Sequence, residues 1–324
     1  MYPNFKKDRP LLILAPMDDV TDSSFRSIVN LCCPPDISFT EFCNVDGLNS
    51  SGKDRLRVKL DHSKTETNLI AQLWGLNPNN FYQTAQEIIR GEYGKFVGVD
   101  LNMGCPDKTI VKNGACSALI ENRDLALNII KATQKGLNGK LPLSVKTRLG
   151  TSSIDYSWHK FLLEQNLDML IIHGRTRLEM SKVAAHWGAI KKIRELRDEI
   201  SPSTLIIGNG DVTSYDQALS LSHKYQLDGV MVGRGIFNDP YLFSPQEIWE
   251  QTSPPQKIKL YLRHVQLFNK AWGNNRPVYI LNKFCKVYIN NFPGSKELRE
   301  QLMQAKDIID LQSKLRTILD TLKK

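Results

Sequence analysis

One cysteine of this chain stands where a reactive thiol could be presented to a ligand. Cys105 lies in the turn Asn102–Pro106, which has the sequence NMGCP and directly follows the apolar run Phe96–Leu101. Pro106 restricts Cys105 to an extended backbone, and Gly104 removes side-chain bulk beside it. Because a free thiol has a pKa of about 8.5, it stays mostly protonated at neutral pH and can act as a general acid. The alternative is a cysteine that only packs in a turn.

Three polar side chains near the ends of other apolar runs point to a redox cofactor. They are Gln72, Lys146 and His173. A cation beside a flavin pyrimidine ring stabilises the negative charge that the ring carries when it is reduced. A lone histidine at such a position is more often structural, so His173 gains weight only from the company of Lys146 and Gln72.

Two glycine-containing turns late in the chain could bind a phosphate group. They are Asn209-Gly210-Asp211 and Gly233-Arg234-Gly235. Glycine lets backbone N–H groups approach an anion closely, and Arg234 adds a positive charge. Either segment alone would be interpreted as a tight turn, but the pair favours a ligand that carries phosphate.

Eight short apolar runs are the strands that we expect to position these side chains. They are Leu11–Ala15, Ile37–Glu41, Asn68–Leu73, Phe96–Leu101, Leu143–Thr147, Met169–His173, Leu205–Gly208 and Gly229–Val232. The helix-like stretches between them include Asn79–Arg90, Arg123–Lys135, Trp158–Gln165, Ala189–Ile200 and Tyr215–His223. Helix starts are expected at Thr21 or Asp22, at Asn79 and at Ser214.

This alternation indicates parallel strands with right-handed crossovers. Eight such units favour an α/β fold of the (β/α)8 TIM-barrel type over an open sheet, and no GxGxxG fingerprint follows the first strand. A barrel of this kind carries its active site at the C-terminal strand ends, and its phosphate site commonly follows strands seven and eight. The polar side chains named above fall at these ends, so the sequence predicts a ligand-binding barrel mouth.

The positive charge of the chain is concentrated in its last quarter. The 324 residues hold 43 Lys and Arg against 34 Asp and Glu, and residues 241–324 account for 14 and 7 of them. A basic segment on a near-neutral body favours a polyanionic partner such as nucleic acid. The alternative is a solvated helical surface that happens to be rich in lysine.

From about Ser244 the strand–helix alternation stops and amphipathic helix patterns take over. The expected helices are Ile258–Asn269, Val278–Ile289 and Leu298–Leu322, the last as one helix or as two with a break near Asp307. We therefore expect a TIM-barrel catalytic domain of residues 1–243, followed by a small all-helical C-terminal domain of residues 244–324. Candidates for phosphate contacts in the second domain are Arg263, Arg276, Lys283 and Lys286.

The cysteine spacing and the lack of long apolar runs indicate where the protein is found and whether it binds a metal. The six cysteines show no CxxC pair and no metal-like spacing to histidine, so we expect free thiols and no metal. No apolar run reaches about 18 residues, and the start of the chain has no apolar stretch. We therefore expect a cytoplasmic protein that does not enter a membrane.

Taken in order, the strand-end motifs resemble those of the tRNA-dihydrouridine synthases. The matching segments are Ala15–Met17, Val20–Asp22, Phe25–Arg26, Gln72, Asn102–Pro106, Lys146–Gly150, His173–Thr176, Asn209–Asp211 and Gly233–Gly235. Any one segment is a weak signal, but the ordered set is highly specific.

The resemblance implies an enzyme that binds FMN, takes hydride from NADPH and reduces the C5–C6 double bond of a uridine in the D-loop of tRNA. Reduced FMN would deliver hydride to C6, and Cys105 would be the catalytic residue that protonates C5. The implied cofactor-binding residues are Ala15, Pro16, Met17, Gln72, Lys146, His173, Asn209, Gly210, Asp211, Gly233 and Arg234. Asn102 and Arg175 would face the uracil. The helical domain would bind the tRNA, and the family leans towards monomers.

The sequence departs from the family pattern in two places. After His173–Thr176 the family usually carries an aromatic residue in a Tyr-x-Gly-like stretch before a tryptophan, whereas here the stretch 179–187, EMSKVAAHW, has no such residue before Trp187. This departure concerns the substrate contacts of that loop. Cys116 stands where a small residue, often glycine, is usual. We interpret Cys116 as a packing residue.

Two rival functions stay open at this point. One is another FMN barrel that acts on a free pyrimidine, such as a dihydroorotate or dihydropyrimidine dehydrogenase. The other is a non-catalytic RNA-binding protein that retains the barrel. The basic tail weighs against the first, and intact Cys105, Lys146 and His173 weigh against the second.

Overall fold

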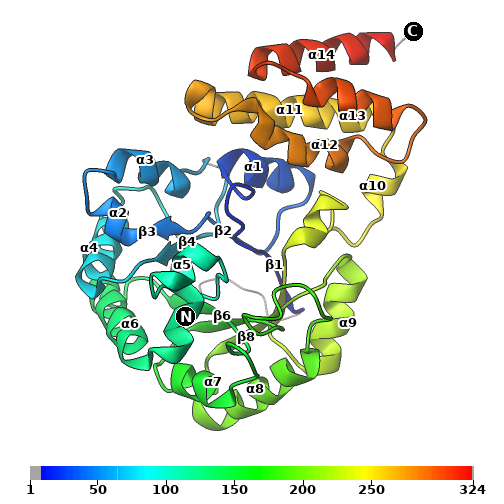
Figure 1. Cartoon of the computed structure of the whole chain (residues 1–324). Coiled ribbons are helices and arrows are strands. Elements are labelled where there is room, and N and C mark those ends of the chain that lie inside the picture. The colour runs from blue at the N-terminus through cyan, green and yellow to red at the C-terminus, as the bar shows by residue number, and fades with distance from the viewer. Residues whose placement is uncertain (1–8, 64, 323–324) are drawn as a thin grey trace.

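Eight parallel strands close into a barrel (Figure 1), which confirms the predicted fold class. The structure is a computed structural model that describes residues 9–63 and 65–322. The barrel strands are β1 (Leu11–Leu14), β2 (Ile37–Phe39), β4 (Leu69–Trp74), β5 (Gly98–Met103), β6 (Leu143–Arg148), β7 (Met169–His173), β8 (Leu205–Asn209) and β9 (Gly229–Val232). The ring closes because β1 pairs with both β9 and β2, and β2 pairs with β4.

The strands differ from the predicted ones mainly at their C-terminal ends. Four of them extend one or two residues beyond the predicted runs, to Trp74, Met103, Arg148 and Asn209, because the barrel register continues past the apolar residues. The strands β1 and β2 end one and two residues earlier than predicted, at Leu14 and Phe39. A two-residue strand, β3 (Cys43–Asn44), also pairs with the end of β4. Two residues are too few to give a periodic sequence signal.

Helices surround the barrel (Figure 1). The long ones are α1 (Ser23–Cys32), α4 (Pro78–Ile89), α6 (Arg123–Leu137), α7 (Tyr156–Leu163), α8 (Trp187–Ile200) and α9 (Tyr215–Tyr225). Shorter turns of helix are α2 (Val45–Leu48), α3 (Lys53–Arg57), η1 (Val58–Leu60), α5 (Lys108–Lys112), η2 (Cys116–Glu121), η3 (Arg234–Phe237) and α10 (Ile248–Gln251).

The helix starts follow capping chemistry. Asp22 caps α1 by accepting a hydrogen bond from the N–H of Phe25, and Ser214 caps α9 as predicted. The predicted cap at Asn79 is wrong, since Asn77 caps α4 and is followed by Pro78, a residue favoured at the first helical position.

The barrel interior has an apolar part and a polar part. The apolar part consists of Leu11, Ile13, Ala15, Ile37, Phe39, Ile70, Met169, Ile171, Ile207 and Met231. The polar part consists of Gln72, Asp100 and Ser144 from β4, β5 and β6, which are fully buried and neighbours in register. A polar layer of this kind needs internal hydrogen bonds to be stable.

The chain from Pro254 to Thr321 forms a group of helices that we name the helical unit. Its elements are α11 (Pro254–Trp272), η4 (Gly273–Asn275), η5 (Val278–Leu281), α12 (Asn282–Tyr288), α13 (Ser295–Met303) and α14 (Ile308–Thr321). The last predicted helix is therefore two, because Asp307 caps α14. No helix within the described residues is long and apolar enough to cross a membrane.

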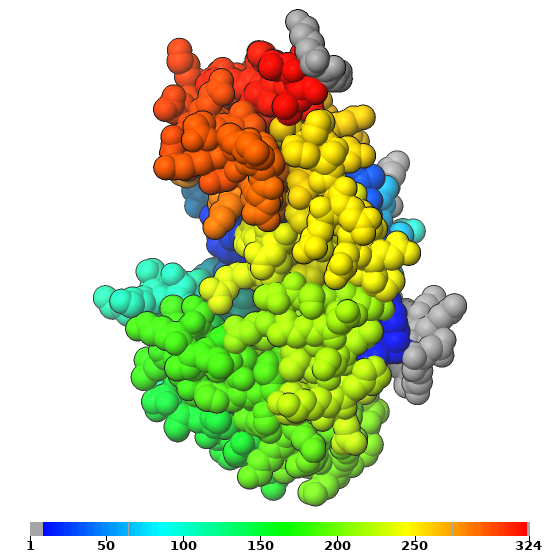
Figure 2. Space-filling model, turned by 90° about the vertical axis from the view of Figure 1, so that its right-hand side faces the viewer, coloured from blue at the N-terminus to red at the C-terminus, as the bar shows by residue number. Residues whose placement is uncertain are grey.

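The helical unit rests on α1 and on η3. The ring of Phe284 in α12 lies 4.9 Å from that of Phe25 in α1 and 5.9 Å from that of Phe237 in η3, measured between centroids. In Figure 2 the unit forms an upper lobe, and the surface is indented between this lobe and the barrel on the left. The division between residues 243 and 244 stays a prediction; it falls between η3 and α10.

Candidate active site

The strand ends surround a cavity of about 540 Å³. All predicted cofactor-binding residues except Gln72 line it, and so does Arg175, one of the two predicted substrate contacts. Gly235, from the second predicted phosphate-binding turn, also lines it. The rest of the lining consists of Arg148, Val212, Thr213 and Asn238, for which no role was predicted from the sequence. Arg148 had a detectable signal, since it lies two residues after Lys146 and neighbouring positions of that spacing share one face of a strand.

Two cations of β6 give the cavity a positive wall. Burial, and after it the charge of the nearby Arg148, lower the pKa of Lys146 to about 8. Arg148 donates a hydrogen bond from Nε to the carbonyl oxygen of Gly104 at 2.8 Å, and burial lowers its pKa to about 10. Both side chains therefore remain mainly cationic at neutral pH, and Arg148 also ties β6 to the Cys105 turn.

His173 lies in this wall as a neutral imidazole. Burial and the charges of Lys146, Arg148 and Arg175 lower its pKa to about 2. The Nη1 atom of Arg175 lies 3.4 Å from His173 Nε2, and because a guanidinium can only donate, Nε2 accepts and Nδ1 carries the proton. His173 can thus accept and donate one hydrogen bond each, but it supplies no positive charge.

Arg175 joins the loops after β7 and β8. Its side chain is 3% exposed and donates hydrogen bonds to the carbonyl oxygen of Val183, at 2.6 Å, and to a carboxylate oxygen of Asp211. The same Asp211 oxygen accepts the N–H of Ala185 at 2.9 Å. The carboxylate of Asp211 therefore holds loops together, and any contact of this residue with an anion would come from its backbone.

The turns after β8 and β9 form one compact cradle. Gly210 has a φ of +138°, which side-chain-bearing residues rarely adopt. A Cβ atom at Gly235 would overlap the carbonyl oxygen of Val212, so the two turns are in direct contact. Asn209 donates its amide to the carbonyl oxygen of Met231 at 2.8 Å, which holds β8 against β9.

A chain of buried hydrogen bonds runs from the barrel interior to the cysteine turn. Asp100 accepts from Ser144 Oγ at 2.6 Å and from Gln72 Nε2 at 2.7 Å. Gln72 Oε1 in turn accepts from Asn102 Nδ2 at 3.1 Å. Asn102 Oδ1 accepts the N–H of Cys105 at 2.9 Å and the N–H of Gly104 at 3.1 Å.

This chain determines the orientation of both amide side chains, because the Asp100 carboxylate can only accept while ionised. Burial raises the pKa of Asp100 to about 7, with the hydrogen bonds and Lys146 opposing the rise. Gln72 and Asn102 thus lie beneath the cavity wall and connect Asp100 to the Cys105 turn by hydrogen bonds. Neither lines the cavity, and their predicted cofactor and substrate contacts stay predictions.

Cys105 is half-buried at the end of β5 and does not line the cavity itself. Its backbone is held from two sides, since Ser117 Oγ donates to its carbonyl oxygen at 2.8 Å and Asn102 accepts its N–H. Burial raises the pKa of its thiol, so the sulfur stays protonated at neutral pH. A protonated thiol on a fixed turn is suited to give up a proton, not to bind a metal.

Carboxylate oxygens of Asp18, Asp19 and Glu41 lie within 4.8 Å of one another, a spacing that could suit a metal ion. Lys59 and Arg276 already form ion pairs with this group. The cluster therefore has its countercharges within the protein, and the expectation of no metal stays a prediction.

Comparisons with known proteins agree with this arrangement. The sequence model of the family described as "Dihydrouridine synthase (Dus)" matches residues 13–323. A "Probable tRNA-dihydrouridine synthase" of Staphylococcus aureus (strain COL) is 43% identical over 311 residues, which cover 95% of this chain and 92% of the relative. A "Probable tRNA-dihydrouridine synthase 2" of Bacillus subtilis (strain 168) is 39% identical over 321 residues, which cover 97% and 96%.

Solved structures show the same fold at low sequence identity. Histamine dehydrogenase from Rhizobium sp. 4-9 superposes with a TM-score of 0.52 at 13% identity, over 79% of this chain and 48% of that one. This likeness shows the fold alone. The family match and the two relatives confirm the resemblance found in the strand-end motifs, and the chain belongs to the dihydrouridine synthase family of oxidoreductases.

Proposed function

We propose that this protein is a tRNA-dihydrouridine synthase. It would bind FMN, use NADPH as reductant and reduce the C5–C6 double bond of a uridine in the D-loop of tRNA. One observation carries the proposal: a glycine cradle and a cationic wall share one cavity, and a protonated thiol ends a neighbouring strand. The names of the relatives support tRNA as the substrate.

The residues of the cavity fit FMN. Gly210 and Gly233 line the cavity with their backbone, and at Gly233 a Cβ would meet no atom closer than 3.8 Å, which leaves room for a phosphate. The exposed Arg234 supplies a cation. Lys146 is suited to stabilise negative charge on the flavin ring, and neutral His173 can hydrogen-bond to it. Ala15, Pro16, Met17, Asn209 and Asp211 would complete the binding site. FMN, when bound, would supply the hydride for C6 of the uracil.

Cys105 would supply the proton for C5. Its thiol is protonated at neutral pH because burial raises its pKa, and its backbone is fixed by Asn102 and Ser117. Asn102 would act mainly by holding this turn. Arg175 would act on the substrate side through the loop that it holds at Val183, in addition to any direct contact with uracil.

The helical unit would give affinity for tRNA. Arg263 and Lys286 are exposed, and the last quarter of the chain is basic. The target uridine would have to leave the folded RNA to reach the cavity, as bases do in other enzymes that act on them. Because phosphate contacts release counterions, binding should weaken steeply as salt rises. We also propose that the enzyme works as a monomer in the cytoplasm.

The test is a visible absorption spectrum of the purified protein, followed without oxygen by NADPH and then by unmodified tRNA. We expect flavin bands that NADPH bleaches and that tRNA restores, with dihydrouridine appearing in the RNA. If NADPH bleaches the flavin bands and tRNA does not restore them, tRNA is not the substrate, and a free pyrimidine becomes the favoured one. Protein that shows no flavin bands, even after FMN is added, would exclude the proposal.

A further inference from the structure

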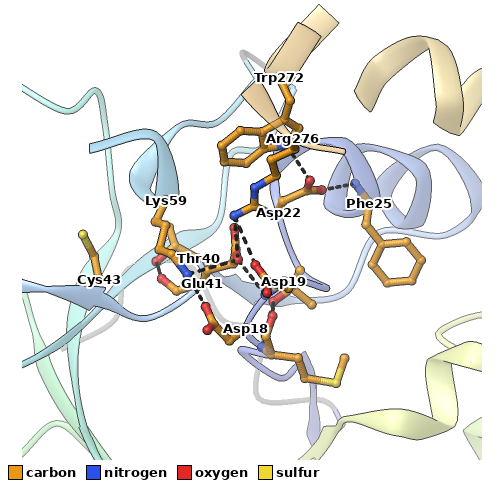
Figure 3. A network of polar contacts seen from close by, with 12 residues as sticks. Asp18, Asp19, Asp22, Phe25, Thr40, Glu41, Cys43, Lys59, Trp272 and Arg276 are labelled. Carbon is orange, nitrogen blue, oxygen red and sulfur yellow. Dashed lines mark hydrogen bonds and ion pairs between the residues drawn. The ribbon is translucent and has the colours of Figure 1, made fainter. Parts of the chain in front are cut away.

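The loop between β1 and α1 is held in an unusual conformation by residues from outside it (Figure 3). Asp19 has a φ of +55°, a left-handed conformation that is uncommon for residues other than glycine. Its N–H donates to Glu41 Oε1 at 2.8 Å, and its carbonyl oxygen accepts from Lys283 Nζ. Its carboxylate lies 3.3 Å from Arg276 Nη2. One strained residue thus has three partners, two of them from the helical unit.

Glu41 is the hub of this network. Its side chain is 1% exposed, and Oε1 lies 3.6 Å from both Lys59 Nζ and Arg276 Nη2. Lys59 also pairs with Asp18 on the loop. A buried carboxylate is costly unless cations lie beside it, so Glu41 depends on one cation from the barrel and one from the helical unit.

Arg276 is built into this junction and is not a surface residue. Its side chain is 12% exposed, and its guanidinium lies 3.7 Å from the ring centroid of Trp272. The indole N–H of Trp272 donates to Asp22 Oδ2 at 2.6 Å, and Asp22 is the cap of α1. A guanidinium covered in this way is poorly placed to contact an RNA phosphate directly, in contrast to the exposed Arg263.

The held loop is part of the active site. Met17 lines the cavity, and its N–H and carbonyl oxygen are both bonded to Thr21 Oγ1. The carboxylate of Asp18 lies close enough to the Cys105 thiol to influence it electrostatically. A displacement of this loop would therefore move groups on the cavity wall and next to the proposed proton donor.

We propose that Arg276 and Glu41 are positioning residues, which fix the β1–α1 loop to the helical unit so that RNA held there meets the Cys105 side of the cavity in one geometry. The proposal rests on the proposed function for its substrate. Arg276 would therefore affect the rate of reaction at saturating tRNA and not the affinity for tRNA. Arg263, exposed on the same unit and proposed to contact tRNA, serves as the contrasting affinity variant.

The first measurement follows the anaerobic reoxidation of the reduced enzyme by increasing amounts of tRNA. Arg276→Ala should lower the rate at saturating tRNA by about tenfold, because small displacements at a reaction centre are costly. The half-saturating tRNA concentration should change by less than about twofold, since no affinity contact is lost. Arg276→Lys should recover part of the rate. Arg263→Ala should instead raise the half-saturating tRNA concentration, because it removes a proposed phosphate contact.

The second measurement does not depend on the substrate. The amides of Met17, Asp19, Val20 and Thr21 are all hydrogen-bonded, so hydrogen exchange reports how firmly the loop is held. Arg276→Ala should speed exchange of these amides and leave those of α4 unchanged. If wild-type enzyme is not reoxidised by tRNA, the proposed function fails, whereas the exchange data still decide whether Arg276 holds the loop.

Glu41→Gln is the second variant if Arg276→Ala does not fold. Its side-chain oxygen can still accept the N–H of Asp19, but the charge that attracts Lys59 and Arg276 is gone. It should show the same loss of saturating rate with faster loop exchange. A saturating rate within about twofold of wild type, or a loss confined to tRNA affinity, would overturn the proposal.

Discussion

Asp100 is the residue on which the geometry behind the cavity depends. Buried carboxylates are stable only when donors surround them, and Asp100 has two, Ser144 Oγ and Gln72 Nε2. Because Gln72 must turn its N–H₂ group towards Asp100, its oxygen is left for Asn102. Asn102 can then use its own oxygen on the backbone of the cysteine turn. A single acceptor thus sets the orientation of two amides and the position of the turn.

Replacing Asp100 with Asn should disrupt this order. Asn offers one acceptor oxygen and one N–H₂ group. If its oxygen keeps the Gln72 contact, the hydroxyl of Ser144 must turn from donating to accepting, and the short hydrogen bond that it donates to the carboxylate is lost. We expect a loss of about 1–3 kcal/mol in the free energy of unfolding, measured with urea. Ser144→Ala removes one donor and leaves the Gln72 contact, so its loss should be smaller. An Asp100→Asn protein as stable as wild type, with Gln72 unmoved in its structure, would contradict this account.

Cys105 and Cys116 give a matched pair for testing the proton donor. Both thiols have pKa values raised by burial, but Cys105 is half-buried at the strand end and Cys116 is fully buried. Cys105→Ala should retain flavin and NADPH oxidation while dihydrouridine formation falls by roughly 10²–10⁴-fold, the usual contribution of general acid catalysis. Cys116→Ala should keep most product formation. Equal yields from the two variants would remove Cys105 from its role.

At the scale of elements, the order of the barrel strands was predictable from the sequence, and their ends were predictable to within two residues. The apolar runs predict the barrel strands, because these strands form the packed core. The polar residues at their C-terminal ends predict the active site, because a TIM barrel binds its ligands there. Missed features lack such a signal. Asp100 lies inside an apolar run, so its partners on β4 and β6 become apparent only from the strand register. In the sequence, Arg276 is one arginine of a basic segment and was therefore interpreted as an RNA contact. Only its packing on Trp272 in the structure indicates a positioning role.

The contact between the turns after β8 and β9 is an element-scale feature that can be tested. In Gly235→Ala the new Cβ would overlap the Val212 carbonyl oxygen, so the turns must separate. We expect weaker binding of FMN to flavin-free protein, by roughly tenfold or more, measured by fluorescence quenching of the added flavin.

Gly188 in α8 is the matched control for this substitution. A Cβ there would have no neighbouring atom within 4 Å, and alanine is the better helix former by roughly 0.5–1 kcal/mol. Gly188→Ala should therefore bind FMN like wild type and unfold at the same or a higher urea concentration. Equal flavin affinity in the two variants would mean that the turns can separate without cost to the cradle.

At the scale of the whole molecule, barrel and helical unit share one apolar core. His264 of α11 lies inside it, 5.6 Å from the ring of Phe25 in the barrel and 4.7 Å from Phe284 in the same unit, measured between centroids. The hydroxyl of Tyr288 bonds to its Nδ1 atom at 3.1 Å. The two parts should therefore unfold together, and a titrating group at their junction should act on the stability of both.

His264 should make the protein less stable in acid. Burial lowers its pKa to about 4, with the charge of Asp22 opposing this, whereas an unfolded histidine titrates near 6.5. Between these values the unfolded state binds the extra proton, so the contribution of His264 to stability is lost as pH falls from about 6.5 towards 4. The loss should approach about 1.4 kcal/mol per pH unit.

His264→Gln removes this titration while keeping an acceptor for Tyr288. The difference in free energy of unfolding between wild type and His264→Gln should therefore shrink as pH falls through that window, measured by urea unfolding at several pH values. Tyr288→Phe, which leaves the histidine buried, should follow the wild-type pH dependence. A constant difference between wild type and His264→Gln would mean that His264 gains its proton without the junction opening. In that case the barrel and the helical unit would not be coupled through this core in the way the packing implies.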